Sequence, residues 1–421
     1  MKSIAILGER LSGLSTAFYL KNKTKNFNLT IFDKSPKIQE GRQIVFHPQN
    51  KNQENHKLYF DQGTNFILLD LLNNPKDKEI YNQIFEKNEI FSKNLSKINK
   101  PVYFLDNNNQ IIKNSLQGTQ MTYKNGLTEI SEKIAKTLEN EIKFNTKINT
   151  ILKPKDSNKW EITYQDIKKN QKFTQNFDLV LVGLEPLTLL KILKNNQKQI
   201  EKDNKKYYNN NQNNNQDFKQ ALNSLQNLEH KQNINISLNF QIPKALIGKE
   251  NINTDFSEFF ALMKEEENND IDFIVVENDK PGHIPDLRGD DKFDFIYLGL
   301  NIQMSNEWTE QNINKEDELI IIYVLEKISK IITNDKNKSF FNPKIIQYTD
   351  KIFKINQYLK YKEVTKWSYS MHYQLNDLNQ YIKNQDKKGI YFCYDILNPQ
   401  PNIINQITKG IKMGKVINQT I

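Results

Sequence analysis

A turn at residues 8–13 carries the residue types that bind phosphate groups. Gly8-Glu-Arg-Leu-Ser-Gly13 follows a short apolar run, and Asp33 stands at the end of a second apolar run. In a dinucleotide-binding unit, glycines let a helix N-terminus approach a pyrophosphate, and an acid after the second strand accepts hydrogen bonds from ribose hydroxyls. The spacing therefore indicates a nucleotide site, with Gly8, Gly13 and Asp33 as its candidate residues.

Two residues of this turn depart from the pattern. Arg10 stands where a second glycine would let the backbone approach the phosphate, and Glu9 adds a negative charge. The guanidinium of Arg10 could also pair with a phosphate if the turn opens. The turn alone therefore leaves nucleotide binding open.

The elements that must position this turn can be read from hydrophobic patterning. Ile4–Leu7 has the continuous apolar character of a buried parallel strand, and Leu29–Phe32 follows as a second one. Between them Leu11, Leu14 and Phe18 recur at helical spacing. This strand–turn–helix–strand order predicts an α/β fold with a Rossmann-type parallel sheet.

Few other residues have the types and grouping that catalysis or metal binding needs. Cys393 is the only cysteine and we expect it in a buried strand, so disulfide scaffolds and cysteine-rich metal sites are excluded. No serine–histidine–aspartate order is evident. The five histidines are scattered and read as surface or packing residues, so no metal site is expected: His47, His56, His230, His283 and His372.

The net charge and the hydropathy of the chain limit the classes of partner that it can have. The chain of 421 residues carries 59 Lys and Arg against 50 Asp and Glu, a net charge of +9. The lysines are spread among acids, which is typical of a solvated surface, so no nucleic-acid partner is expected. Its longest apolar run, Leu319–Leu325, is far shorter than the roughly 18 residues of a spanning helix. We expect a soluble intracellular protein, cytoplasmic by default, although a pI near 9.1 also suits the mitochondrial matrix.

Two polar stretches punctuate the middle of the chain. An Asn-rich tract near residues 204–216 predicts a solvated insertion, because it offers nothing to bury. The stretch from Lys264 to Asp270 is expected to end a helix whose apolar side includes Phe259, Phe260 and Met263.

Several segments together resemble a known family. Residues 4–20 and Ile31-Phe-Asp-Lys34 are similar to the start of the FAD-dependent amine oxidase and renalase-like flavoproteins. Further segments keep that family's order: Glu40-Gly-Arg42, Phe60–Phe66, Lys124–Leu127 with the helix to Leu138, Lys147–Ile151, Trp160–Ile162, Phe177–Val182, Lys366–Ser370, Gly389–Asp395 and the helix near Asn402–Asn418. Residues 190–345 match only in outline.

The resemblance implies a Rossmann-type FAD-binding domain of separated segments with an inserted sheet-based substrate domain. The cofactor domain would comprise residues 1–70, 120–190 and 385–421, and the substrate domain residues 71–119 and 191–384. The resemblance places Gly8 and Gly13 at the pyrophosphate, Asp33 at the adenosine ribose and Arg42 near the pyrophosphate or flavin. It also implies that the backbone of Ile148 meets the adenine, that Asp395 bonds the ribityl or pyrophosphate, and that a helix from near Pro401 faces the flavin.

Three departures from the family pattern fall at cofactor contacts. Arg10, Glu40 and Tyr394 each replace a glycine whose missing side chain would let the backbone approach phosphate or flavin. One hypothesis is therefore a degenerate, non-catalytic structural or accessory subunit of a larger protein assembly. The other is an active FAD-dependent oxidoreductase acting on an amine or a nicotinamide-like substrate. For the second, Trp367 and Tyr369 are substrate-pocket candidates, although alternating aromatics also suit a strand with one buried face.

Overall fold

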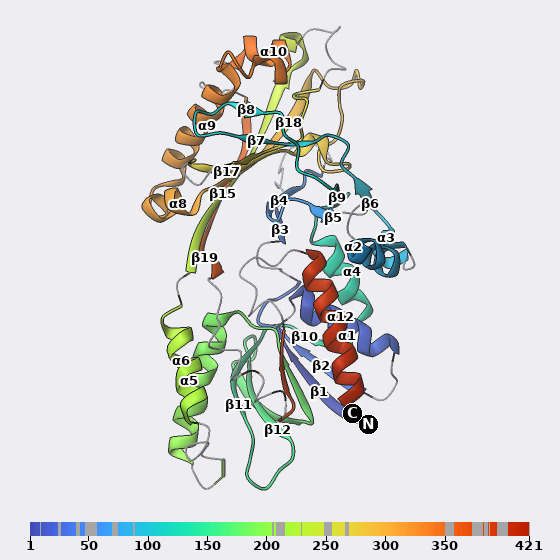
Figure 1. Cartoon of the computed structure of the whole chain (residues 1–421), viewed down its shortest axis with the longest axis vertical. Helices are drawn as coiled ribbons and strands as arrows, with labels where there is room; N and C mark the ends of the chain where they lie inside the picture. The colour runs from blue at the N-terminus through green and yellow to red at the C-terminus, as the bar shows by residue number, and fades with distance from the viewer. Residues whose placement is uncertain are drawn as a thin grey trace. The chain divides into compact units, whose positions relative to one another are not determined.

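The chain forms two compact units that interleave along the sequence. A computed structural model describes residues 1–8, 10–23, 27–38, 43–46, 57–69, 75–86, 89–203, 206–207, 215–228, 230–247, 255–265, 269–349, 358–372, 382, 386, 388–393 and 403–420 (Figure 1). Unit 1 comprises Met1–Gly41, Ile130–His230 and Met371–Ile421, and unit 2 comprises Arg42–Glu129 and Lys231–Ser370. These boundaries lie elsewhere than those expected for the cofactor and substrate domains, whose roles stay predictions.

Unit 1 is built on a five-stranded parallel sheet. Its strand order is β10 (Ile142–Lys143), β2 (Phe27–Phe32), β1 (Lys2–Leu7), β14 (Leu179–Val182) and β20 (Ile390–Phe392). The central strand β1 is apolar because it is covered on both faces, and Ile4 to Leu7 are fully buried. The strand–helix–strand unit expected at the N-terminus is therefore confirmed.

A second sheet and several helices belong to the described part of unit 1. The antiparallel strands β11 (Thr146–Leu152), β12 (Trp160–Asp166) and β13 (Gln171–Phe177) pair in chain order. The helices are α1 (Leu11–Lys23), α4 (Glu129–Thr137), α5 (Pro186–Lys202), α6 (Asn215–Gln226) and α12 (Ile403–Thr420). Helix α5 packs on β11, and the apolar sides of both join one hydrophobic cluster with β14 and β20.

Helices α1 and α12 lie side by side in unit 1, although they come from opposite ends of the chain (Figure 1). Their backbones approach closely because α12 has Gly410 and Gly414 on the side that faces α1. The hydroxyl of Thr16 bridges the two helices by donating to the carbonyl oxygen of Gly410 at 2.9 Å. The last helix, α12, therefore packs against α1, the helix that follows the N-terminal turn.

Unit 2 is built on a seven-stranded mixed sheet. Its order is β19 (Leu359–His372), β15 (His230–Pro243), β18 (Phe295–Met304), β17 (Ile271–Val276), β16 (Ala261–Lys264), β7 (Val102–Leu105) and β8 (Ile111–Ile112). Helix α9 (Asp317–Thr333) buries a broad apolar face, and all of its isoleucines except Ile322 join the same core as β15 and β18. The apolar run 319–325 therefore belongs to a core helix.

Smaller elements surround that sheet in unit 2. Two short sheets are β3 (Gln43–Phe46) with β4 (Phe60–Gly63), and β5 (Ile67–Leu69) with β9 (Thr119–Tyr123) and β6 (Leu95–Lys97). The remaining helices are α2 (Pro75–Ile80), the π-helix η1 (Tyr81–Glu86), α3 (Glu89–Ser92), α7 (Lys244–Ile247), α8 (Asn306–Asn312), α10 (Pro343–Gln347) and the 3-10 turns η3 (Glu277–Asp279) and η4 (Lys338–Phe340).

One expected helix is wrong. Phe259, Phe260 and Met263 do not lie on a helix, because residues 261–264 form β16 between β17 and β7. Phe260 is fully buried and Phe259 is 1% exposed, since the segment is covered on both sides. Most of the Asn-rich tract lies outside the described residues, and α6 begins at Asn215.

Candidate functional site

The carboxyl ends of β1 and β14 meet at the topological switch point of the unit 1 sheet, the place where the strand order reverses. We call this place the switch point. β2 lies on one side of β1 and β14 on the other, so the loops that leave the two strands diverge there. Gly8 follows β1 and has a φ of +92°, and a Cβ built on it would lie 2.8 Å from the carbonyl oxygen of Gly183, which follows β14. Glycine is required at residue 8, because any side chain would strain the turn and meet that backbone.

The structure brings Gly8, Gly13 and Asp33 to this edge, and a fourth predicted residue, Ile148, to the strand beside it. The backbone N–H of Gly8 donates to Phe32 at the end of β2, and Asp33 follows directly. A Cβ on Gly13 would lie 3.1 Å from the carbonyl oxygen of Gly8, so α1 begins immediately behind the turn. Ile148 lies on β11 and shares a hydrophobic cluster with Phe32.

Asp33 also shapes its own loop. One carboxylate oxygen accepts a hydrogen bond of 2.6 Å from the backbone N–H of Ser35, and its carbonyl oxygen accepts one of 2.6 Å from Thr146 at the start of β11. Its carboxylate therefore has a structural task at the carboxyl end of β2.

An ion pair joins the N-termini of the two helices at this edge. Arg10 precedes α1 and its Nη2 lies 3.8 Å from Oε2 of Glu185, the N-cap residue of α5. Both side chains are about two-fifths exposed, at 38% and 43%. Thr188 fixes the other carboxylate oxygen of Glu185 through a hydrogen bond of 2.9 Å. The carboxylate of Glu185 therefore lies beside the start of α5, although it accepts no capping hydrogen bond from the backbone N–H groups of that helix.

The other predicted residues are not part of this described edge. Arg42, Glu40, Asp395 and Tyr394 lie outside the described residues. Trp367 is half-buried on β19 in unit 2. Tyr369 lies on the same strand, but its side chain is outside the described part of the chain. Strand β19 is consistent with the interpretation of the aromatics as residues of a strand.

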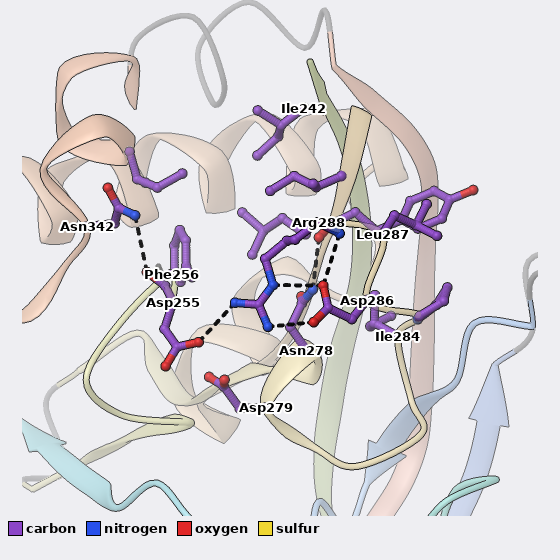
Figure 2. Close-up of a pocket in the computed structure, with 15 residues that line it drawn as sticks. Ile242, Asp255, Phe256, Asn278, Asp279, Ile284, Asp286, Leu287, Arg288 and Asn342 are labelled. Atoms are coloured by element: carbon purple, nitrogen blue, oxygen red, sulfur yellow. Dashed lines mark hydrogen bonds and ion pairs between the residues drawn. The ribbon is translucent and has the colours of Figure 1, made fainter. Parts of the chain in front are cut away.

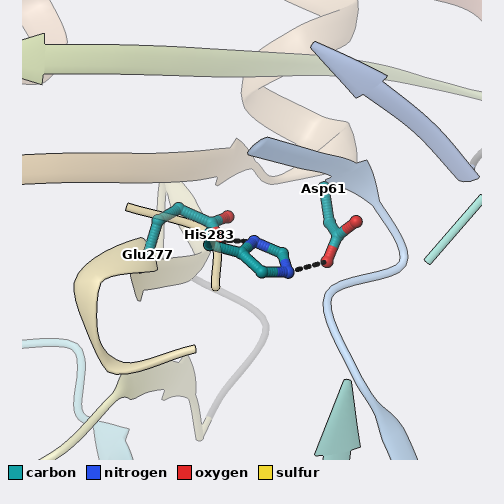
Figure 3. Close-up of side chains that lie close together, drawn as sticks. All are labelled: Asp61, Glu277 and His283. Atoms are coloured by element: carbon teal, nitrogen blue, oxygen red, sulfur yellow. Dashed lines mark hydrogen bonds and ion pairs between the residues drawn. The ribbon is translucent and has the colours of Figure 1, made fainter. Parts of the chain in front are cut away.

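A buried charged cluster lies in unit 2 and was not predicted. Four residues form this cluster, which we call the ion quartet: Asp61 on β4, Glu277 in η3, Lys280 and His283. Figure 3 shows all of them except Lys280. None of the four side chains is more than 1% exposed. The Nζ of Lys280 lies 3.0 Å from Oδ2 of Asp61 and 3.2 Å from Oε2 of Glu277. Each charge is therefore compensated without water.

The hydrogen bonds of His283 complete the quartet. Its Nδ1 lies 2.8 Å from the carboxylate of Glu277, and its Nε2 lies 3.1 Å from the carbonyl oxygen of Tyr123. Both of these partners are acceptors, so both ring nitrogens donate when the ring is an imidazolium.

The quartet resembles a metal site only in its carboxylates and imidazole. Donor atoms of Asp61, Glu277 and His283 lie within 4.8 Å of one another. The ammonium of Lys280 touches both carboxylates and supplies the positive charge that a metal ion would bring. We therefore assign the quartet a structural role that ties β4, η3 and β9 together.

The charge of the quartet has a consequence for acid stability. Burial alone would raise the pKa of Glu277, but the charges of Lys280 and His283 and their hydrogen bonds outweigh it and lower that pKa below 4.5. A depressed carboxyl pKa stabilises the fold above 4.5, and this contribution is lost as the pH falls through the lowered pKa. We expect the stability gap between the wild type and Glu277→Gln, measured by urea unfolding, to be largest near neutral pH and to shrink in acid. A gap that does not change with pH would contradict this assignment.

A second group of charges borders a cavity of about 80 Å³ in unit 2. Figure 2 shows the guanidinium of Arg288 between Asp286 and Asp255. Arg288 donates from Nε and Nη2 to the two carboxylate oxygens of Asp286 at 2.7 Å and from Nη1 to Asp255 at 3.2 Å. The hydrogen bond from Arg288 lowers the pKa of Asp286. These charges satisfy one another at the edge of a mixed wall, which also contains Asn278, Asp279 and Asn342.

The residues at the switch point fit a dinucleotide in part. Gly8, Gly13 and Gly183, which we call the glycine cradle, pack closely against neighbouring backbone, as the glycines of the tight turn in a dinucleotide-binding unit do. The side chains do not fit, because the carboxylate of Glu185 would repel a phosphate and Arg10 already has a partner. We therefore derive no reaction step through a bound flavin.

No protein-family model and no curated protein matches the sequence. Three solved structures match 100% of this chain and 99% of their own. They are a putative protoporphyrinogen oxidase from Exiguobacterium sp. 255-15 (TM-score 0.62, 11% identity), a putrescine oxidase triple mutant redesigned in cofactor binding (0.62, 8%) and cyclohexylamine oxidase from Brevibacterium oxydans IH-35A (0.60, 9%).

At such identities the likeness concerns the fold alone. It extends over the whole length of the chain and includes both interleaved units. No helix in the described part of the chain is long and apolar enough to cross a bilayer. The chain therefore has the predicted α/β fold, which it shares with these three oxidase structures.

Proposed function

We propose that this chain is a non-catalytic member of the FAD-oxidase fold, kept as a structural or accessory subunit of a larger protein assembly. The observation that carries the proposal is the Arg10–Glu185 ion pair at the sheet's switch point. The family resemblance extends the proposal to a degenerate relative of the amine oxidase and renalase-like flavoproteins.

The ion pair opposes a pyrophosphate in two ways. A helix N-terminus attracts an anion through its free N–H groups and its dipole. Glu185 places a negative charge beside the start of α5, and this charge would repel a phosphate there. Arg10 brings a side chain to the place where the pattern has glycine, and its guanidinium is engaged by Glu185. A phosphate would have to displace a carboxylate that Thr188 also holds.

The other two lost glycines support the same proposal. Glu40 and Tyr394 replace glycines in the segments that resemble the family's cofactor contacts. The proposal therefore includes FAD binding that is weak or absent, with Arg42 and Asp395 left without their expected cofactor partner. A basic net charge of +9 suits the mitochondrial matrix, which cell fractionation would test.

An apolar strip on α9 supports the accessory role. Leu319 and Ile322 lie three residues apart on this helix and are 54% and 45% exposed. We propose that another subunit covers these two neighbouring side chains in the assembly. Purification from native cells should recover the chain in a particle heavier than its own 49.7 kDa.

An active FAD-dependent oxidoreductase is the second candidate, and the glycine cradle favours it. In that case Gly8 and Gly13 would hold the pyrophosphate and Asp33 the ribose of FAD. The isoalloxazine ring would supply the redox chemistry, and the substrate would be an amine or a nicotinamide-like molecule, bordered by Trp367 and Tyr369. Half-exposed ion pairs are weak, about 0–1 kcal/mol, so a tightly held FAD could displace the Arg10–Glu185 pair.

A double substitution separates the two candidates. We expect the wild type to take up little FAD and the Arg10→Gly, Glu185→Gln variant to bind it at least about tenfold more tightly, because one side chain and one repelling charge leave the switch point. Fluorescence quenching of added FAD measures both affinities.

A matched control removes another ion pair of unit 1. Lys21 and Glu141 form a pair of 2.8 Å at the far end of α1, so Lys21→Ala, Glu141→Gln should leave FAD affinity unchanged. Equal affinities of the wild type and the Arg10–Glu185 variant would refute the role of the ion pair. Stoichiometric FAD in the wild type would favour the oxidoreductase.

A further inference from the structure

A cavity of about 370 Å³ lies inside unit 1, between α5, the β11–β13 sheet and β20. Its volume falls within the range of small-molecule sites. The apolar part of its wall comes from five elements, β11, β12, β14, α5 and β20. These residues are Ile151, Leu152, Trp160, Val182, Leu189, Leu193, Ile200, Ile390 and Phe392.

The wall is built from core residues. Trp160 is 6% exposed, Leu193 4% and Phe392 5%, and all three belong to the hydrophobic cluster that holds unit 1 together. The cavity opens to solvent at a polar rim and has these apolar side chains on its inner wall. A ligand with an apolar body would pack against this inner wall and remove its apolar surface from water.

The rim of the cavity is basic. Lys153 and Lys155 follow β11, and Lys388 precedes β20; Ser157 and Asn158 complete the polar edge. None of the described residues that line the cavity is acidic. The nearby carboxylate of Glu161 is engaged by the hydroxyl of Tyr207 at 2.5 Å and by Lys206 at 3.0 Å. The entrance therefore attracts an anion.

We propose that this cavity binds a small amphiphilic carboxylate, with its alkyl tail among Trp160, Leu193 and Phe392 and its carboxylate among the three rim lysines. A protonated amine would meet like charge at this rim, and a fully polar anion would leave the apolar wall unfilled. The site is distinct from the switch point and holds whether or not the chain binds FAD.

Decanoate is the probe, and Trp160 is the reporter. Replacing Trp308 and Trp367 by phenylalanine leaves Trp160 as the single tryptophan. We expect saturable, one-to-one change of Trp160 emission with decanoate, tighter binding than for octanoate, and a rise in melting temperature. The absence of saturable binding would overturn the proposal, and so would equal affinity for decan-1-ol or decylammonium.

Two kinds of variant locate the site. Leu193→Trp, read out by melting temperature and calorimetry, fills the cavity and should weaken decanoate binding by about tenfold or more. Leu189→Phe is the milder alternative if the first variant does not fold by circular dichroism. Lys153→Gln with Lys388→Gln should weaken decanoate but not decan-1-ol, and Lys159→Gln, a lysine outside the cavity, should change neither. Unchanged decanoate affinity in both the folded filling variant and the lysine variant would overturn the assignment.

Discussion

Replacing Lys280 by methionine is expected to lower the free energy of unfolding of unit 2 by about 3–5 kcal/mol. The substitution keeps the approximate volume of the side chain but removes its charge. Asp61 and Glu277 would then share one cation, His283, in a site that excludes water. An uncompensated buried carboxylate is far more costly than a broken surface pair.

Trp308 lies in the core of unit 2 at 8% exposure and can report its urea unfolding once Trp160 and Trp367 are replaced by phenylalanine. Lys113→Met is the matched control, because this lysine pairs with Glu258 at the surface and should contribute no more than about 1 kcal/mol. A loss for Lys280→Met no larger than that of the control would contradict our assignment. Adding Glu277→Gln to Lys280→Met should recover part of the loss, because it removes the unpaired charge.

Gly410→Ala is expected to destabilise unit 1 by about 1–3 kcal/mol, although alanine favours a helix by about 1 kcal/mol over glycine. The new Cβ would overlap the carbonyl oxygen of Ser12 and lie 2.8 Å from Cβ of Ser15. Both belong to the first turns of α1, so relief requires α1 and α12 to separate. This separation would also disturb the turn that ends at Gly13.

Gly414 provides the matched control in the same helix. A Cβ there would meet the ring of Tyr19 at 2.7 Å, and that ring can rotate whereas the backbone of Ser12 cannot. Chemical unfolding followed by Trp160 should therefore show a smaller loss for Gly414→Ala than for Gly410→Ala. Equal losses, or a gain for Gly410→Ala, would show that the two helices are not held at this contact.

The sequence predicts those elements whose structure depends on residues that are close together in the chain. The turn from Gly8 to Gly13, α1 and β2 follow from apolar spacing and glycine placement within some thirty residues. The aromatic segment around Phe260 was less predictable, because a doubly covered short strand has the same apolar density as a helix face. The segment is a strand because β16 pairs with β17 and also with β7, which is distant in the sequence.

The candidate sites depend on residues that are far apart. Asp61 and Lys280 are separated by 219 residues, and nothing in the local pattern of either shows that they meet. The spacing of Glu277, Lys280 and His283 around Pro281-Gly282 was visible, but it indicates only a turn. Likewise Glu185 joins Arg10 only because β14 pairs with β1. Asp33, by contrast, was predictable because it follows β2 directly.

The visible absorption spectrum of the native, purified protein tests the central claim most directly. We predict a folded protein without flavin bands that stays colourless after incubation with FAD and desalting. A stoichiometric yellow chromophore, released by acid and identified as FAD, would contradict the claim that the Arg10–Glu185 pair closes the switch point.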